Sequence, residues 1–171
     1  SNTLNRSIGT TAFSVEVEEQ DVEDGALFKS IDVYVSIRDL TPDNGTTVAA
    51  DALIKTIDAS AFSTGPTGLP RGIISATFGE AEAAMGLDAT THSPGDLFIF
   101  ELRLNLTDGR TFGADDAAGI ITGGFFSSPY AYNTLLLCSP EPGDYRVDMH
   151  DSYGDGWQTD DGSGGSGIAL A

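Results

Sequence analysis

Carboxylate side chains and glycines lie close together near the end of the 171-residue chain. Calcium takes about six to eight oxygen ligands, mainly from carboxylates, backbone carbonyls and water. Asp151 and Asp155 could converge on one ion if the backbone turns sharply between and after them, and Gly154 and Gly156 permit such a turn. The segment therefore predicts a Ca²⁺ site, and its candidate ligands are Asp148, Asp151, Asp155, Asp160 and Asp161.

The same segment has a second interpretation. Its spacing departs from the EF-hand loop, in which acidic ligands alternate before a glycine and a later glutamate. An acidic turn exposed to water, with Tyr153 and Trp157 covering a core, has the same composition. Both interpretations stay open on the sequence alone.

The remaining reactive side chains form no catalytic pattern. His92 and His150 lie in different predicted domains and lack companions at the spacing of zinc ligands. No nucleophile motif such as Gly-x-Ser-x-Gly and no glycine-rich phosphate loop occurs in the sequence. Glu80 and Glu82 could form a carboxylate pair for sugar hydrolysis, but they fit the polar face of one short helix better. The sequence thus predicts a protein that is not an enzyme.

The net charge of the chain disfavours some classes of binding partner. Acidic residues outnumber basic ones by 26 to 8, which gives a formal net charge of −18. Such a surface repels phosphate backbones and anionic lipid headgroups, so nucleic-acid and membrane-surface binding are disfavoured. No apolar run approaches the roughly 20 residues of a membrane-spanning helix. An Asp- and Gly-rich, Lys-poor composition is typical of secreted or cell-surface β-proteins, although an acidic intracellular protein also fits.

Cysteine usage adds one expectation. Cys138 is the single cysteine, so no disulfide can form within the chain. We expect either a buried, unreactive thiol at the end of a strand or a bond to a cysteine outside this sequence.

Apolar and polar residues alternate along much of the chain, which indicates half-buried antiparallel strands. The clearest alternations, with further short apolar segments, predict strands near residues 13–18, 31–38, 52–58, 72–77, 98–107 and 131–138. Asp108-Gly109 predicts a two-residue hairpin loop between the 98–107 strand and a short strand at 110–112. The expected core contains Val15, Val33, Val35, Phe100, Leu102 and Leu104.

One helix is predicted. Thr77 and Glu80 have the spacing of a capping box, an alanine-rich stretch follows, and Gly86 stands where a glycine commonly ends a helix. About seven strands and this connector predict an all-β fold: an immunoglobulin-like antiparallel β-sandwich. The start of a second β-domain follows it.

The domain boundaries follow from composition. Residues 1–138 are long enough to form the sandwich, and the prolines and glycine of 139–143 predict a short linker. Residues 144–171 are too few to fold alone, so we expect them to be a truncated second β-domain that carries the Asp/Gly-rich loop.

Several motifs resemble one protein family. The segment Asp151-Ser-Tyr-Gly-Asp-Gly-Trp157, after Gly143-Asp-Tyr-Arg-Val147, resembles a module of surface proteins in bacteria with SusCD-type outer-membrane importers. Asp32-Val-Tyr-Val-Ser36, Asn105–Phe112 and Gly123–Tyr130 resemble the immunoglobulin-like first domain of lipoproteins associated with those importers. The resemblance implies an extracellular, secreted or lipid-anchored accessory protein, with a metal in the Asp-Gly loop.

The expected function follows from these points together. We expect a non-enzymatic protein of the cell surface, or a secreted one, that captures a ligand or assists an outer-membrane SusCD-type nutrient-uptake complex. A glycan or a peptide could be the ligand, and contact with the membrane would run only through a lipid anchor outside this chain. The alternatives are a non-catalytic appendage of a secreted hydrolase and a structural adhesin module.

Overall fold

The computed structural model describes residues 3–42, 45–116 and 130–138, and all of them belong to a unit that spans Ser1–Ser139. The predicted linker 139–143 and the second domain 144–171 lie outside the described residues. The strands are β1 (Thr3–Asn5), β2 (Ala12–Glu18), β3 (Phe28–Arg38), β4 (Ala52–Asp58), β5 (Ser63–Thr64), β6 (Pro70–Thr77), β7 (Leu97–Leu106), β8 (Thr111–Phe112) and β9 (Ala131–Leu137). The helices are α1 (Phe78–Met85) and the 3-10 turns η2 (Ala59–Ala61) and η3 (Ala114–Asp116).

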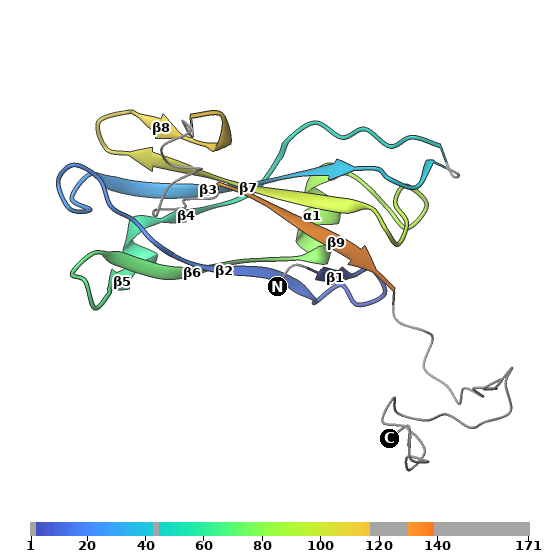
Figure 1. Ribbon diagram of the computed structural model, residues 1–171, viewed down its shortest axis with the longest axis horizontal. Helices are drawn as coiled ribbons and strands as arrows, with labels where there is room; N and C mark the ends of the chain where they lie inside the picture. Colours follow the sequence, from blue (N-terminus) through green and yellow to red (C-terminus); the bar gives the residue numbers. More distant parts are fainter. Residues whose placement is uncertain (1–2, 43–44, 117–129, 139–171) are drawn as a thin grey trace, which may run out of the picture. The chain divides into compact units, whose positions relative to one another are not determined.

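The strands form two facing sheets (Figure 1). One sheet has the order β1-β9-β7-β3-β4, with β8 beside β7, and the other has the order β2-β6-β5. Strands β2, β6 and β5 thus correspond to strands B, E and D of an immunoglobulin domain, and β9, β7, β3 and β4 to G, F, C and C′. The all-β sandwich predicted from the sequence is confirmed. One pairing is parallel, between β1 and β9, so the larger sheet is mixed rather than purely antiparallel.

The predicted alternation places the expected faces inward. Val33, Val35 and Phe100 are fully buried and Leu102 is nearly so, as expected. Val15 is only partly buried because β2 is the outer strand of its sheet. Leu104 is also only partly buried: at this point of β7 the neighbouring strand is the two-residue β8 instead of β9.

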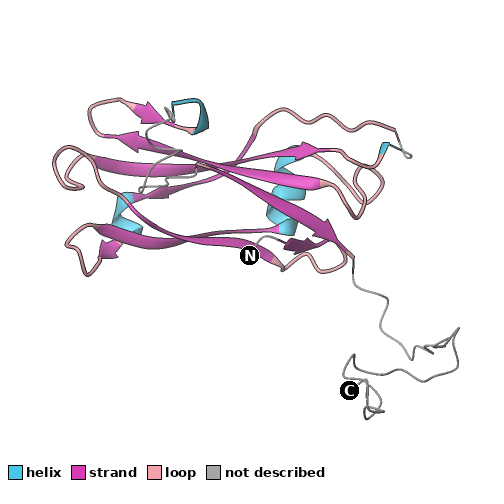
Figure 2. Ribbon diagram, viewed as in Figure 1, coloured by secondary structure: helices cyan, strands magenta, loops and turns pink. Residues whose placement is uncertain are grey.

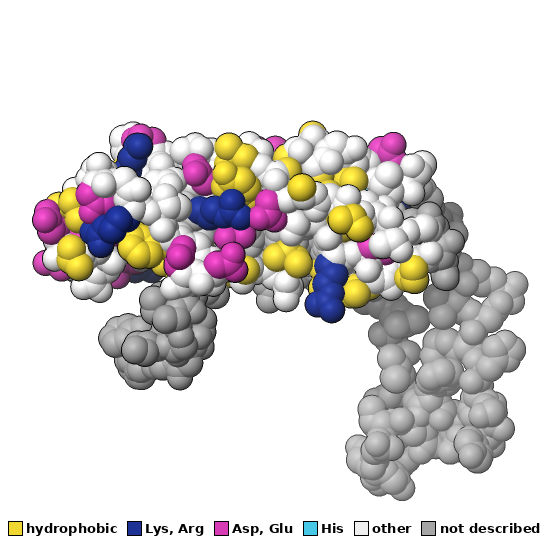
Figure 3. Space-filling model, turned by 90° about the horizontal axis from the view of Figure 1, so that it is seen from above, with side chains coloured by type: hydrophobic (Ala, Val, Ile, Leu, Met, Phe, Trp, Pro, Cys, Tyr) yellow, Lys and Arg dark blue, Asp and Glu magenta, His cyan; other side chains and the backbone are white. Residues whose placement is uncertain are grey.

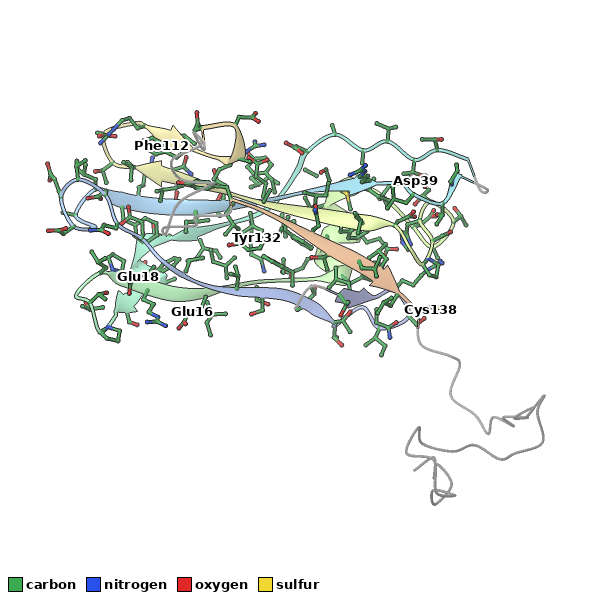
Figure 4. All side chains as sticks on the ribbon, viewed as in Figure 1. Glu16, Glu18, Asp39, Phe112, Tyr132 and Cys138 are labelled. Atoms are coloured by element: carbon green, nitrogen blue, oxygen red, sulfur yellow. The ribbon has the colours of Figure 1, made fainter. Side chains whose placement is uncertain are left out.

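Aromatic rings join the two sheets. Phe13 on β2 and Phe100 on β7 stack almost parallel, with ring centroids 4.6 Å apart. Tyr132 of β9 lies between the sheets (Figure 4) and completes the cluster at 5.2 Å from Phe13. In antibody domains a disulfide joins the corresponding two strands, B and F. Here apolar contact alone connects them.

Helix α1 closes one end of the sandwich between the sheets (Figure 2). Thr77 caps it, and both hydrogen bonds of the predicted capping box with Glu80 are present. Gly86 ends it in the left-handed region at φ 66°. Phe78, in the first turn, is buried and stacks on Phe98 of β7 at 5.6 Å. The helix is therefore a connector that is anchored in the core by its first turn.

The predicted hairpin joins β7 to β8. The Gly109 N–H donates to the Leu106 carbonyl, and the Leu106 N–H donates to the Arg110 carbonyl. The loop is thus three residues long rather than two, with Gly109 at φ 91° in the left-handed position that such loops require.

The aromatic contact between the sheets leads to the first prediction. Phe100→Ala removes one ring of the stack and leaves a cavity in a fully buried place, so the free energy of unfolding should fall by about 3–5 kcal/mol. Leu53→Ala, on β4 of the same sheet where the residue is 48% exposed, should cost less than about 1 kcal/mol. Urea unfolding of both variants measures the difference. Equal losses would show that Phe100 does not hold the sheets together.

Candidate ligand-binding loops

Three connections meet at the end of the sandwich opposite α1 (Figure 1). They are the β2–β3 loop (19–27), the β5–β6 turn (65–69) and the segment after β7 (107–116), with Tyr130 before β9. The Thr107 N–H donates to the Leu27 carbonyl at 2.8 Å, which holds two of these connections together. We call this set of residues the loop end. In immunoglobulin variable domains the corresponding B–C and F–G loops bind the ligand, so the loop end is the candidate site.

A single carboxylate organises the β2–β3 loop. Asp21 accepts hydrogen bonds from the backbone N–H groups of Glu23, Gly25 and Leu27 at 2.7, 3.1 and 2.8 Å. Burial opposes its ionisation, but the N–H donors outweigh burial and lower the pKa of Asp21. Gly25, at φ 87°, packs so closely on Pro70 that a Cβ would lie 2.4 Å from that ring. These contacts hold the loop in the closed conformation that the structure shows.

A second carboxyl of the loop end has no such donors. Glu19 directly follows β2, and its N–H donates to the Pro70 carbonyl at 2.9 Å. The residue is only 5% exposed, and within the part of the chain that the structure describes neither side-chain oxygen has a hydrogen-bond partner. Burial, with the nearby charge of Asp21, raises the pKa of Glu19 to about 7. Burial, followed by the charges of Asp116 and Glu19, also raises the pKa of Tyr130.

One arginine partly offsets the acids of the loop end. Arg110 forms an ion pair with Asp108 at 2.7 Å, and its guanidinium lies 5.8 Å from the centre of the Phe112 ring. Acidic residues still dominate the loop end; they are Glu19, Asp21, Glu23, Asp24, Asp108, Asp115 and Asp116. The loop end can therefore attract a positively charged group, and it repels anions.

Charged side chains also form a network on the outer face of the larger sheet. The Arg103 guanidinium lies 3.9 Å from the centre of the Tyr34 ring and forms ion pairs with Glu101 and Asp51 at 3.0 and 2.6 Å. The molecule seen from above has basic and acidic side chains side by side with exposed hydrophobic ones between them (Figure 3). Because Arg103 already has these partners, we interpret the network as support for the sheet rather than as a binding site.

The candidate catalytic residues are separated by their contacts. Glu80 binds Lys55 and its own helix cap, whereas Glu82 binds the Nε2 atom of His92 at 2.8 Å. His92 is buried against the rings of Phe78 and Phe98. The two glutamates thus have different partners, and His92 links helix α1 to the segment before β7.

Cys138 is not the buried thiol that was one of the two expectations from the sequence. Its side chain is exposed at the end of β9 (Figure 4), not buried. Alternation would place Cys138 on the inward face with Thr134 and Leu136, but the strand pairing ends at Leu137, so Cys138 lies past the end of the sheet.

The predicted calcium ligands Asp148, Asp151, Asp155, Asp160 and Asp161 lie outside the described residues. Within 3–42, 45–116 and 130–138, no three His, Cys, Asp or Glu side chains are grouped so that they could hold a metal ion. In the same part of the chain, no helix is long and apolar enough to cross a membrane.

Glu19 is a site residue that was not predicted from the sequence, although the sequence contains a signal for it. The inward positions of β2 are Phe13, Val15 and Val17, and the same alternation places residue 19 on the inward face. A carboxylate at an inward position directly before a turn is the pattern that identifies this residue.

Comparisons with protein-family models, with curated proteins and with solved structures gave no match for this chain.

The second prediction concerns the β2–β3 loop. Asp21→Ala removes the acceptor of three N–H groups, so the amides of Glu23, Gly25 and Leu27 should exchange with solvent deuterium faster. The amide of Leu40, which bonds Asp96 in another loop, should keep its protection. Residue-resolved hydrogen exchange by NMR measures both. Unchanged exchange at all three amides would mean that Asp21 does not hold the loop.

Proposed function

We propose that this protein is a non-enzymatic accessory or ligand-capturing protein of the cell surface, acting with a SusCD-type outer-membrane nutrient-uptake complex. The observation that carries the proposal is the loop end: an immunoglobulin-like sandwich presents two connections, which correspond to antibody ligand loops, and Asp21 fixes one of them. A binding surface of fixed shape loses little conformational entropy when it captures a partner.

The contacts of the reactive groups favour binding over catalysis. The partners of Glu80 and Glu82 separate these two carboxylates, and His92 is enclosed by aromatic rings. A general base must reach a substrate proton, and a buried imidazole behind two phenyl rings does not.

The location and the partner rest on the sequence. The acidic, lysine-poor composition is typical of surface and secreted proteins, and the motifs at 32–36, 105–112, 123–130 and 151–157 resemble importer-associated lipoproteins. A lipid anchor outside this chain would attach the protein to the outer membrane. The ligand would be a glycan or a peptide.

We also propose that the segment 148–161 binds Ca²⁺. Seven acids between positions 141 and 161 face one arginine, Arg146. Without a cation these like charges repel one another, whereas a divalent ion turns the repulsion into coordination. Binding to the folded form alone would stabilise it by about 2.7 kcal/mol at a hundredfold excess over the dissociation constant.

The third prediction tests calcium binding. Calcium should slow proteolysis between residues 143 and 171 and shift the emission of Trp157, the single tryptophan of the chain. Asp155→Ala should abolish both effects, and Asp115→Ala, in the sandwich, should abolish neither. Identical cleavage and emission in chelator and in millimolar calcium would contradict the proposal.

The fourth prediction tests the partner. An affinity-tagged chain added to solubilised outer membranes of a bacterium with SusCD-type importers should recover the importer's large β-barrel. Asp21→Ala should weaken this recovery because it loosens the loop end. Glu16→Gln, on the outer face of β2 (Figure 4), should not.

Two results would favour the alternatives. Recovery of a soluble secreted hydrolase in place of the barrel would support an appendage role. Binding to whole cells without recovery of a barrel would support an adhesin module.

A further inference from the structure

Glu19 is enclosed by the protein without a compensating interaction. The residue is only 5% exposed, and neither carboxyl oxygen has a hydrogen-bond partner among the described residues. The β2–β3 loop passes directly over it: a Cβ on Gly25 would lie 3.4 Å from Glu19 Oε2. The loop in this position therefore covers the Glu19 carboxyl, so its stability depends on whether that carboxyl is neutral or ionised.

The charged groups around Glu19 do not neutralise it. From the β2–β3 loop it faces Asp21, a like charge, and from the entry to β9 it faces Tyr130. Asp116 of η3 adds negative charge near Tyr130, and the positive charge of Arg110 acts on Asp21 instead. On β6 the nearest arginine, Arg71, forms its ion pair with Glu16 on the outer face of the sheet. Arg110 and Arg71 are thus each paired with another acid.

The neutral and the ionised form of a carboxyl buried in this way differ in the free energy that burial costs. The neutral form loses only hydrogen bonds to water, whereas the ionised form also loses the solvation of a full charge and meets Asp21. We propose that Glu19 is a proton-controlled latch: its neutral carboxyl lets the β2–β3 loop close over it, and its ionisation opens the loop end.

The direction of the pH effect follows from the electrostatics. The pKa of Glu19 in the folded protein is about 7, against an ordinary value of 4.5, so the closed form binds the proton more tightly than the open form. The free energy with which protonation of Glu19 favours the closed loop is thus fully present below pH 4.5. It decreases as the pH rises towards 7 and is lost above 7. The proposal concerns regulation of the loop end and holds whichever ligand or partner the protein has.

Hydrogen exchange of the loop amides tests the latch. We expect the protection factors of the Glu23, Gly25 and Leu27 amides to fall between pH 5 and pH 8.5. The largest possible change over this range is roughly 75-fold, because part of the roughly 300-fold effect expected between pKa values of 4.5 and about 7 is already lost at pH 5. Glu19→Gln removes the titrating group, so its protection factors should not change across this range. Glu18→Gln, one position earlier and exposed, should behave as the wild type.

Two results would overturn the proposal. One is a wild-type loop whose protection factors do not vary with pH, and the other is a Glu19→Gln variant that keeps the wild-type variation. If Glu19→Gln does not fold, ¹³C NMR of the wild-type protein follows the Glu19 carboxyl directly. A titration midpoint below pH 5 would then reject the latch, and a midpoint near 7 would support it.

Discussion

The stack of Phe13 on Phe100 is the contact on which the sandwich depends. It joins β2 of one sheet to β7 of the other, where antibody domains use a covalent bond, and it does so with two fully buried rings. Phe98 extends the row towards helix α1 through Phe78. Because dispersion and apolar burial supply this connection, the fold needs no cysteine pair. The single cysteine, Cys138, lies exposed at the end of β9 and takes no part in joining the sheets.

This aromatic row also determines what happens at the loop end. The stack fixes which face of β2 points inward, and the alternation of the strand then carries the inward direction to residue 19. Glu19 directly follows the last residue of β2 and keeps the inward direction of Phe13, and its N–H still bonds the Pro70 carbonyl of β6. The burial of Glu19 is thus a consequence of core packing.

Local patterns in the sequence predicted much of this fold. Period-two alternation was sufficient for β2, β3 and β7, and the capping box of Thr77 and Glu80 was sufficient for the start of α1. The parallel pairing of β1 with β9 was missed because three residues carry no periodic signal and their pairing depends on a strand more than a hundred positions away. The function of Glu19 was missed for a related reason: the environment of a carboxyl comes from tertiary neighbours such as Pro70 and Tyr130.

A buried carboxyl lies at each end of the sandwich, and the pKa values of the two are shifted in opposite directions. Near α1, Asp96 is fully buried and accepts hydrogen bonds from the Ser93 and Leu40 N–H groups and the Thr41 hydroxyl at 2.7–2.8 Å. Burial opposes its ionisation, but these donors lower its pKa, so its contribution to stability is lost only as the pH falls through that low value. Glu19, without donors, loses its contribution as the pH rises towards 7. As the pH rises from the low pKa of Asp96 through the pKa of Glu19, the end near α1 keeps its hydrogen bonds while the loop end opens. A fold built in this way can respond to pH at its loop end while the two sheets stay folded.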